Sequence, residues 1–170
     1  MEASKRAMVE LKETTTIAAP IERCFDLARS VEVHLAGNVH FGESAVAVGG
    51  VTSGLVDLGQ RVTWRARHLG VWQNLTSEIT RMDRPSYFRD EMIRGAFKMM
   101  EHDHYFSATS ESGTVMTDLF RFAAPLGILG RIAEVVALRR YMANLLHERN
   151  VVIKKIAESE EWQRYVREKI

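Results

Sequence analysis

The sequence predicts one α+β domain, in which a curved antiparallel sheet of about seven strands wraps around a long C-terminal helix. Three observations lead to this fold class. The chain has 170 residues, enough to bury one substantial core. Its central part alternates between polar and apolar residues with a period of two, which is typical of strands. After Pro125 the apolar period becomes helical and continues to about Glu158.

The first part of the chain predicts one strand and two short helices. Val9–Ile17 is rich in threonine and β-branched side chains, which favour strands. Pro20 suits the first position of a helix, because its missing N–H would have no partner there. Apolar residues then recur at helical spacing over residues 21–28. We expect a second short helix over Ser30–Ala36, which ends at Gly37.

Six further strands are expected between Glu43 and Pro125. Glycine or proline stands in each break between them, and these residues favour turns. Consecutive strands joined by short breaks pair antiparallel, because parallel neighbours need long crossover connections. The expected strands are Ser44–Val48, Gln60–His68, Val71–Met82, Tyr87–Arg94, Met99–Ala108 and Thr114–Ala123.

The long helix is expected from about Ile128 to Glu158, followed by a tail with Trp162 and Tyr165. A sheet with one apolar face needs a cover, and this helix is the only predicted element large enough to supply it. Where the curved sheet and the helix diverge, we expect a cavity for a small molecule. At about 100° per residue, the apolar stripe of the helix consists of Leu138, Met142, Leu145, Leu146, Ile153 and Ile156.

Composition and charge point to an ordinary globular protein of a reducing compartment. There are 23 Lys and Arg against 22 Asp and Glu, so no global field attracts nucleic acid or an anionic membrane. The single cysteine, Cys24, excludes an internal disulfide and is expected to be a buried packing thiol. Residues 1–13 lack the apolar centre of a secretory signal, and no run reaches about 18 apolar residues. We therefore expect a cytoplasmic protein with no nucleic-acid partner and no stable membrane insertion.

Two predicted hairpins can be put into register, and together they place a row of acidic and histidine side chains on one face. A turn centred on Glu111 puts His104 opposite Asp118. A turn centred near Phe97 puts His104 opposite Asp90 as well. Directly opposed residues point to the same face of a sheet. The row Asp90–His104–Asp118 is therefore expected to cross three strands on the inner face.

The same registers predict apolar neighbours for this row and a charged face behind it. The expected neighbouring rows are Met92–His102–Phe120 and Phe88–Phe106–Met116. The alternate side chains are polar, so we expect them to be solvated and the even-numbered face to point inward. This outer set consists of Arg89, Glu91, Glu101, Asp103, Thr117 and Arg121.

Arg149 falls within the apolar stripe of the long helix rather than on its polar side. An unpaired buried charge is very costly, so a core-facing arginine needs a carboxylate partner. Asp90 and Asp118 are the expected partners. Arg131 lies on the same stripe, but close enough to the helix start to reach solvent.

Several short segments match a known pattern. They are Arg65–Gly70, Phe88–Met92, Gly95–Phe97, His102–Phe106, Thr117–Asp118, Ala124–Gly127 and Glu148–Asn150. In these segments the chain resembles the START/SRPBCC superfamily, which has the helix-grip fold, and the likeness covers nearly all of residues 1–170 as one domain. The superfamily includes polyketide cyclases, lipid-transfer domains, plant allergen-like ligand carriers and coenzyme-Q-binding proteins. The nearest likeness is to bacterial members labelled cyclase/dehydrase-like.

Three functions fit this scaffold, because one fold can carry several activities. The first is a carrier or sensor with an apolar cavity for a lipid, polyketide or isoprenoid-like ligand. The second is a cyclase/dehydrase-type enzyme, in which His104 is the acid–base group and Asp90 or Asp118 orients it. The third is a non-catalytic interaction domain whose cavity is filled by side chains. The sequence is also compatible with a homodimer.

The polar residues of the expected site fit two roles. Asp90, His104, Asp118 and Arg149 could orient a ligand, or they could form a buried ion-pair network between sheet and helix. His102 and His104 form an H-x-H pattern compatible with metal binding, but beyond the aspartates no third ligand is evident. We therefore expect neither a metal nor another cofactor. The expected ligand-contacting residues are Phe88, Asp90, Met92, His102, His104, Phe106, Met116, Asp118, Phe120, Trp64 and Arg149.

Overall fold

The computed structural model describes residues 8–37, 45–68, 70–123 and 132–166. Its strands are β1 (Val9–Ile17), β2 (Ala45–Gly50), β3 (Arg61–His68), β4 (Val71–Asp83), β5 (Tyr87–Arg94), β6 (Met99–Ala108) and β7 (Thr114–Ala123). Its helices are α1 (Ile21–Ala28), α2 (Val31–Gly37), α3 (Ile132–Ala157) and the 3₁₀ helix η2 (Glu160–Arg164).

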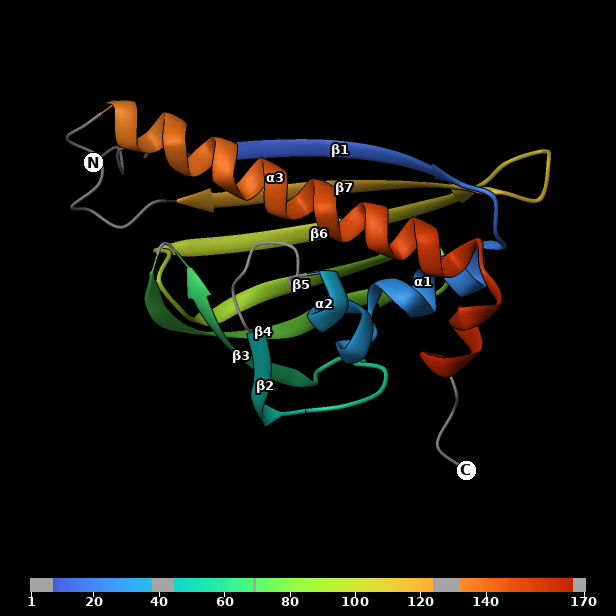
Figure 1. Cartoon of the computed structure of the whole chain (residues 1–170), viewed down its shortest axis with the longest axis horizontal. Coiled ribbons are helices and arrows are strands. Elements are labelled where there is room, and N and C mark those ends of the chain that lie inside the picture. Colours follow the sequence, from blue (N-terminus) through green and yellow to red (C-terminus); the bar gives the residue numbers. More distant parts are fainter. Residues whose placement is uncertain (1–7, 38–44, 69, 124–131, 167–170) are drawn as a thin grey trace.

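The strands form one antiparallel sheet in the order β1-β7-β6-β5-β4-β3-β2, and α3 lies across its concave face (Figure 1). The predicted fold class is confirmed. With 26 residues, α3 makes about seven turns. The expected start of this helix, near Ile128, lies outside the described residues. Among the described helices, none combines the length and the apolar character needed to cross a membrane.

The short helices α1 and α2 pack under the C-terminal half of α3 (Figure 1). Gly37 ends α2 where that helix meets α3, and a Cβ placed on it would lie 3.3 Å from the Cα of Arg149. A glycine at this position therefore lets the two helices approach closely beside Arg149. Cys24 is free and fully buried in α1, as predicted. The core around it includes Ile17, Phe25, Leu27, Met116 and Ile153.

The register of β6 against β7 is the predicted one. His104 lies opposite Asp118, and Phe106 lies opposite Met116. These side chains point to the inner face, and all four are buried. The even-numbered residues of these strands therefore face the helix, as the alternation of polar and apolar residues predicts.

The predicted register of β5 against β6 is wrong by two residues. Asp90 lies opposite His102, and Phe88 lies opposite His104. The turn is centred one residue before Phe97. In a hairpin, moving the centre of the turn by one residue changes the cross-strand partner of every residue by two positions. Because side chains alternate with a period of two, a shift by two keeps every side chain on its predicted face. The face is correct, whereas the straight row of three polar residues is not.

The outer face of the sheet is not simply solvated. Asp103 is 0% exposed, contrary to the expectation for this position. Arg89 donates to its two carboxylate oxygens at 2.6 and 2.8 Å, and Arg121 donates to Oδ2 at 2.8 Å. The hydroxyl of Tyr87 donates to Oδ1 at 2.6 Å. Long arginine side chains lie over the sheet and cover the carboxylate, which a pattern of alternating polarity does not reveal.

Candidate functional site

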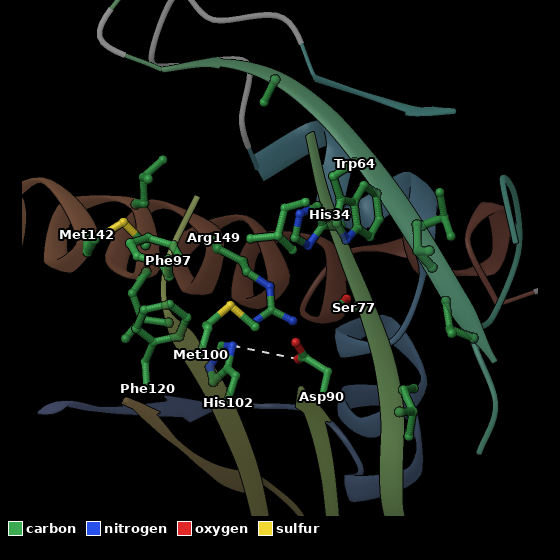
Figure 2. A pocket seen from close by; sticks show the side chains of 18 of the residues that line it. His34, Trp64, Ser77, Asp90, Phe97, Met100, His102, Phe120, Met142 and Arg149 are labelled. Atoms are coloured by element: carbon green, nitrogen blue, oxygen red, sulfur yellow. Dashed lines mark ion pairs between the residues drawn. The ribbon is translucent and has the colours of Figure 1, made fainter. Parts of the chain in front are cut away.

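A cavity of about 340 Å³ lies between the concave face of the sheet and α3. This volume is within the usual range for small-molecule sites, which is about 300–1,000 Å³. The junction of α1 and α2, strands β3 to β7 and α3 contribute its wall (Figure 2). Most of the wall is apolar, and the large side chains in it include Trp64, Ile79, Phe97, Met100, Phe120 and Met142.

Three charged or ionisable side chains meet on one side of this cavity. Figure 2 shows Arg149 extending from α3 toward Asp90 of β5 and His102 of β6. Their position follows from the register, since Asp90 and His102 are direct cross-strand neighbours on the inner face. His102 Nδ1 lies 3.9 Å from Asp90 Oδ2. The cavity therefore has an apolar body and one polar end.

Behind the polar end lies a completely buried carboxylate, Asp118. His102 Nε2 donates to its Oδ1 at 2.8 Å, and Asn150 Nδ2 donates to its Oδ2 at 2.7 Å. His104 Nδ1 lies 2.7 Å from Oδ1, although the ring is not aligned for a hydrogen bond there. Burial by itself raises the pKa of Asp118. The hydrogen bond from His102 and the interactions with His104 outweigh burial, so that pKa lies well below its usual value.

Asp90 and His104 form the second carboxylate–imidazole contact. His104 Nε2 lies 3.2 Å from Asp90 Oδ2, within hydrogen-bond distance. Burial raises the pKa of Asp90, but the hydrogen bond with His104 and the nearby His102 lower it further than burial raises it. Burial, followed by repulsion from His104, lowers the pKa of His102 to about 4. His102 is thus a neutral imidazole near pH 7, held between two carboxylates.

Arg149 makes the expected ion pair with Asp118, but its best hydrogen bond goes elsewhere. Nη1 lies 3.7 Å from Asp118 Oδ1, whereas Nη2 donates to the carbonyl oxygen of Ala28 at 2.8 Å. Nη1 is buried and has no hydrogen-bond partner. The side chain also lines the cavity, so the positive charge of Arg149 belongs to its polar end.

Six of the residues expected to contact a ligand lie on the cavity wall. They are Trp64, Phe88, Asp90, His102, Phe120 and Arg149. The structure places Met92, His104, Phe106, Met116 and Asp118 outside this wall. The ring of Phe25 in α1 packs edge-on against Phe106, with 5.5 Å between ring centroids, so α1 covers this part of the sheet. His104 and Asp118 lie behind His102 instead, where they support the polar end.

His34 of α2 is a wall residue that was not expected from the sequence. Its ring stacks on Trp64 with 3.9 Å between ring centroids. Burial, together with the charge of Arg149, lowers the pKa of His34 to about 3. Because α2 has only seven residues, its apolar period is too short to indicate which side chain faces a cavity. Ser77 and Asn74 of β4 also line the wall and were not expected from the sequence. The register of β4 shifts immediately before Ser77, so one period of two does not describe the whole strand.

Within the described part of the chain, one group of side chains has the donor atoms and the spacing to hold a metal ion. It consists of Asp90, His102 and His104, whose candidate ligand atoms all lie within 4.8 Å of one another. The sequence shows the two histidines as an H-x-H pair. The third ligand comes from a neighbouring strand, and only the register of β5 against β6 brings it close.

Comparison with known proteins supports the fold. No family model matches the sequence, and no curated protein matches it. Among solved structures, a protein of Thermus thermophilus is 20% identical, with a TM-score of 0.64 over 85% of this chain and 97% of that one. A START superfamily protein from Mycobacterium smegmatis is 10% identical, with a TM-score of 0.65 over 88% and 97% of the two chains.

A plant protein has the same fold. The ginseng major latex-like protein 151 from Panax ginseng is 13% identical, with a TM-score of 0.60 over 89% of this chain and 99% of that one. At such identities the likeness concerns the fold alone. The expected helix-grip fold is therefore confirmed, and the function has to be argued from the site.

Proposed function

We propose that this chain binds a small, largely apolar molecule in the cavity under α3, and acts in the cytoplasm as a carrier or sensor for a lipid, polyketide or isoprenoid-like ligand. The observation that carries the proposal is a cavity of about 340 Å³ with an apolar wall and polar groups on one side. Apolar walls supply affinity through burial, and a few polar groups orient the bound molecule. The methionines Met100 and Met142 add adaptable surface, which suits ligands of varied shape.

The polar end indicates what the ligand carries. The Arg149 side chain lines the cavity and carries a positive charge there. A ligand oxygen beside it would gain from that charge, and a carboxylate would gain most. We therefore propose a ligand with an apolar body and one oxygen-bearing end, whose oxygen lies against Arg149.

The enzymatic alternative has less support. His104, the expected acid–base group, is 0% exposed and is not part of the cavity wall. His102 does reach the cavity, but with its pKa lowered to about 4 it is a weak base. The cavity volume also argues against an interaction domain whose interior is filled by side chains.

The experiment has two parts. Native mass spectrometry of freshly purified protein should detect a co-purified small molecule. Fluorescence titration with anilinonaphthalene sulfonate, which has an apolar body and one anionic group, should show saturable binding. Leu145→Trp fills part of the cavity and should weaken the binding of this probe at least about tenfold, a free-energy change of about 1.4 kcal/mol.

A matched control is Val136→Trp, since this residue of the same helix is 60% exposed and is not part of the cavity wall. The control variant should bind the probe as the unmodified chain does. Equal binding by all three proteins would place the probe outside the cavity. Together with the absence of any co-purified molecule, that result would refute the proposed function.

A further inference from the structure

We propose that Asp90, His102 and His104 form a site for a divalent transition-metal ion at the polar end of the cavity, with Zn²⁺ as the first candidate. Two imidazole nitrogens and one carboxylate oxygen form a donor set that suits Zn²⁺ and its neighbours in the first transition row. The inference goes beyond the proposed ligand binding and does not depend on it.

The distances between the donor atoms are close to those of a metal site. Zn²⁺ lies about 2.0–2.1 Å from each nitrogen or oxygen ligand. Tetrahedral angles then place the ligand atoms about 3.3 Å apart. Asp90 Oδ2 lies 3.2 Å from His104 Nε2 and 3.9 Å from His102 Nδ1. All three ligand atoms lie within 4.8 Å of one another, so their separations would shorten by about 1.5 Å at most to complete the geometry.

Asp118 orients both imidazoles from behind. It accepts from His102 Nε2 at 2.8 Å, which leaves the lone pair of His102 Nδ1 directed toward Asp90. The same oxygen, Oδ1, lies 2.7 Å from His104 Nδ1. Metal-binding histidines commonly direct their second nitrogen at a carboxylate, which fixes the tautomer and strengthens the ligand. Here one fully buried carboxylate serves both rings.

His104 lies between two carboxylates, at 3.2 Å from Asp90 and 2.7 Å from Asp118. A neutral imidazole has one N–H and one lone pair, so it can donate to only one of them. The ring is not aligned for a hydrogen bond from Nδ1 to Asp118. A metal ion bound by Nε2 would also bind Asp90 and His102, so one ion would place a positive charge between all three side chains.

The charges around the site tolerate a divalent cation. The two carboxylates of Asp90 and Asp118 face one cation, Arg149. Arg149 is held back by its hydrogen bond to the carbonyl of Ala28, and its Nη1 remains 3.7 Å from Asp118. The three side chains therefore carry a net charge of about −1 when both carboxylates are ionised. A bound Zn²⁺ ion would change that net charge to about +1, and Arg149 could keep its present position.

The position of the site would let a bound ion contact a molecule in the cavity. Asp90 and His102 lie on the cavity wall. An ion held by them would keep one coordination position open toward the cavity, as ions that bind a water or a substrate do. The oxygen-bearing end of a cavity ligand could then meet both this ion and Arg149.

The test uses the full chain after treatment with a chelator. Isothermal titration with Zn²⁺ should give one site per chain. Titration with Co²⁺ should give visible absorption bands typical of nitrogen and oxygen coordination. Asp90→Asn and His102→Gln should each weaken Zn²⁺ binding at least about 100-fold and abolish the Co²⁺ bands. Asp118→Asn keeps all three ligands, so it should weaken binding about 10–100-fold while the bands persist.

The control is His147→Gln, because this histidine is 63% exposed, pairs with Glu13 and is not part of the cavity wall. It should bind both metals normally. Far-UV circular dichroism and a thermal melt show whether each variant is folded, and Asp90→Asn changes only one atom, so its shape is retained. Zn²⁺ binding that is unchanged in Asp90→Asn, or lost in His147→Gln, would overturn the proposal. Absence of binding by the folded, unmodified chain would overturn it as well.

Discussion

Arg149→Met tests how the polar end is built. Methionine keeps the length and the apolar stem of the side chain, but it removes the guanidinium. The change deletes the hydrogen bond from Nη2 to the carbonyl of Ala28 and the long ion pair with Asp118. A hydrogen bond from a charged donor contributes about 1.5–3 kcal/mol. Breaking a tightly paired buried ion pair would cost more, about 3–5 kcal/mol.

The structure favours the smaller cost. Asp118 keeps its hydrogen bonds from His102 and Asn150 when Arg149 is replaced, so its charge is not left without partners. We therefore expect the free energy of unfolding to fall by about 2 kcal/mol. For a chain of this length that corresponds to a decrease in Tm of about 4–8 °C. Denaturant unfolding and a thermal melt measure the two quantities.

Arg140→Met is the matched control, because Arg140 is an exposed arginine on the same helix. Its stability should change by no more than about 0.5 kcal/mol. Anilinonaphthalene sulfonate should bind Arg149→Met at least about tenfold more weakly than the unmodified chain. A loss of more than about 4 kcal/mol would mean that Asp118 depends on Arg149, and unchanged probe binding would remove Arg149 from the ligand site.

Two other predictions concern different parts of the molecule. Asp103→Asn should lower the free energy of unfolding by about 2 kcal/mol, because a buried carboxylate that accepts from two arginines loses its charge. A denaturant titration measures this loss. The control Glu111→Gln, in an exposed turn, should have no effect in the same titration. The pKa of His34 is about 3 in the folded chain and about 6.5 when unfolded. Only the unfolded chain takes up this proton between those values, so stability should fall as the pH is lowered from 6.5 toward 3; if His34→Gln leaves this slope unchanged, His34 is not its source.

Strand positions could be predicted because alternation and turn residues specify them locally. The bounds of β5, β6 and β7 agree with the expected ones. Register depends on the turn, and the turn after β5 has a glycine but no dipeptide that defines its type. The resulting error is two residues in pairing. The polar cluster still forms, because the rings of His102 and His104 reach diagonal neighbours on the same face.

The division of the inner face into cavity and core could not be predicted in the same way. Phe88 and Phe106 are both buried on the same face, yet only Phe88 lines the cavity. Phe25 of α1 packs against both rings with 5.5 Å between centroids, so the boundary between core and cavity falls beside α1, at Phe88. Where a short helix lies over a sheet is decided by tertiary packing, so the period of one strand carries no information about it.

Asn150 shows how a helical period can identify a site residue that charge alone does not. It lies four residues after Leu146 and three before Ile153, and all three are buried. This spacing puts Asn150 in the middle of the stripe that faces the sheet. Asn150 is therefore the residue of α3 that hydrogen-bonds Asp118, at 2.7 Å. Arg149, one position away and about 100° around the helix, lies at the edge of the stripe. Because Asn150 already hydrogen-bonds the buried carboxylate, Arg149 needs no close contact with Asp118, and its side chain lines the polar end of the cavity.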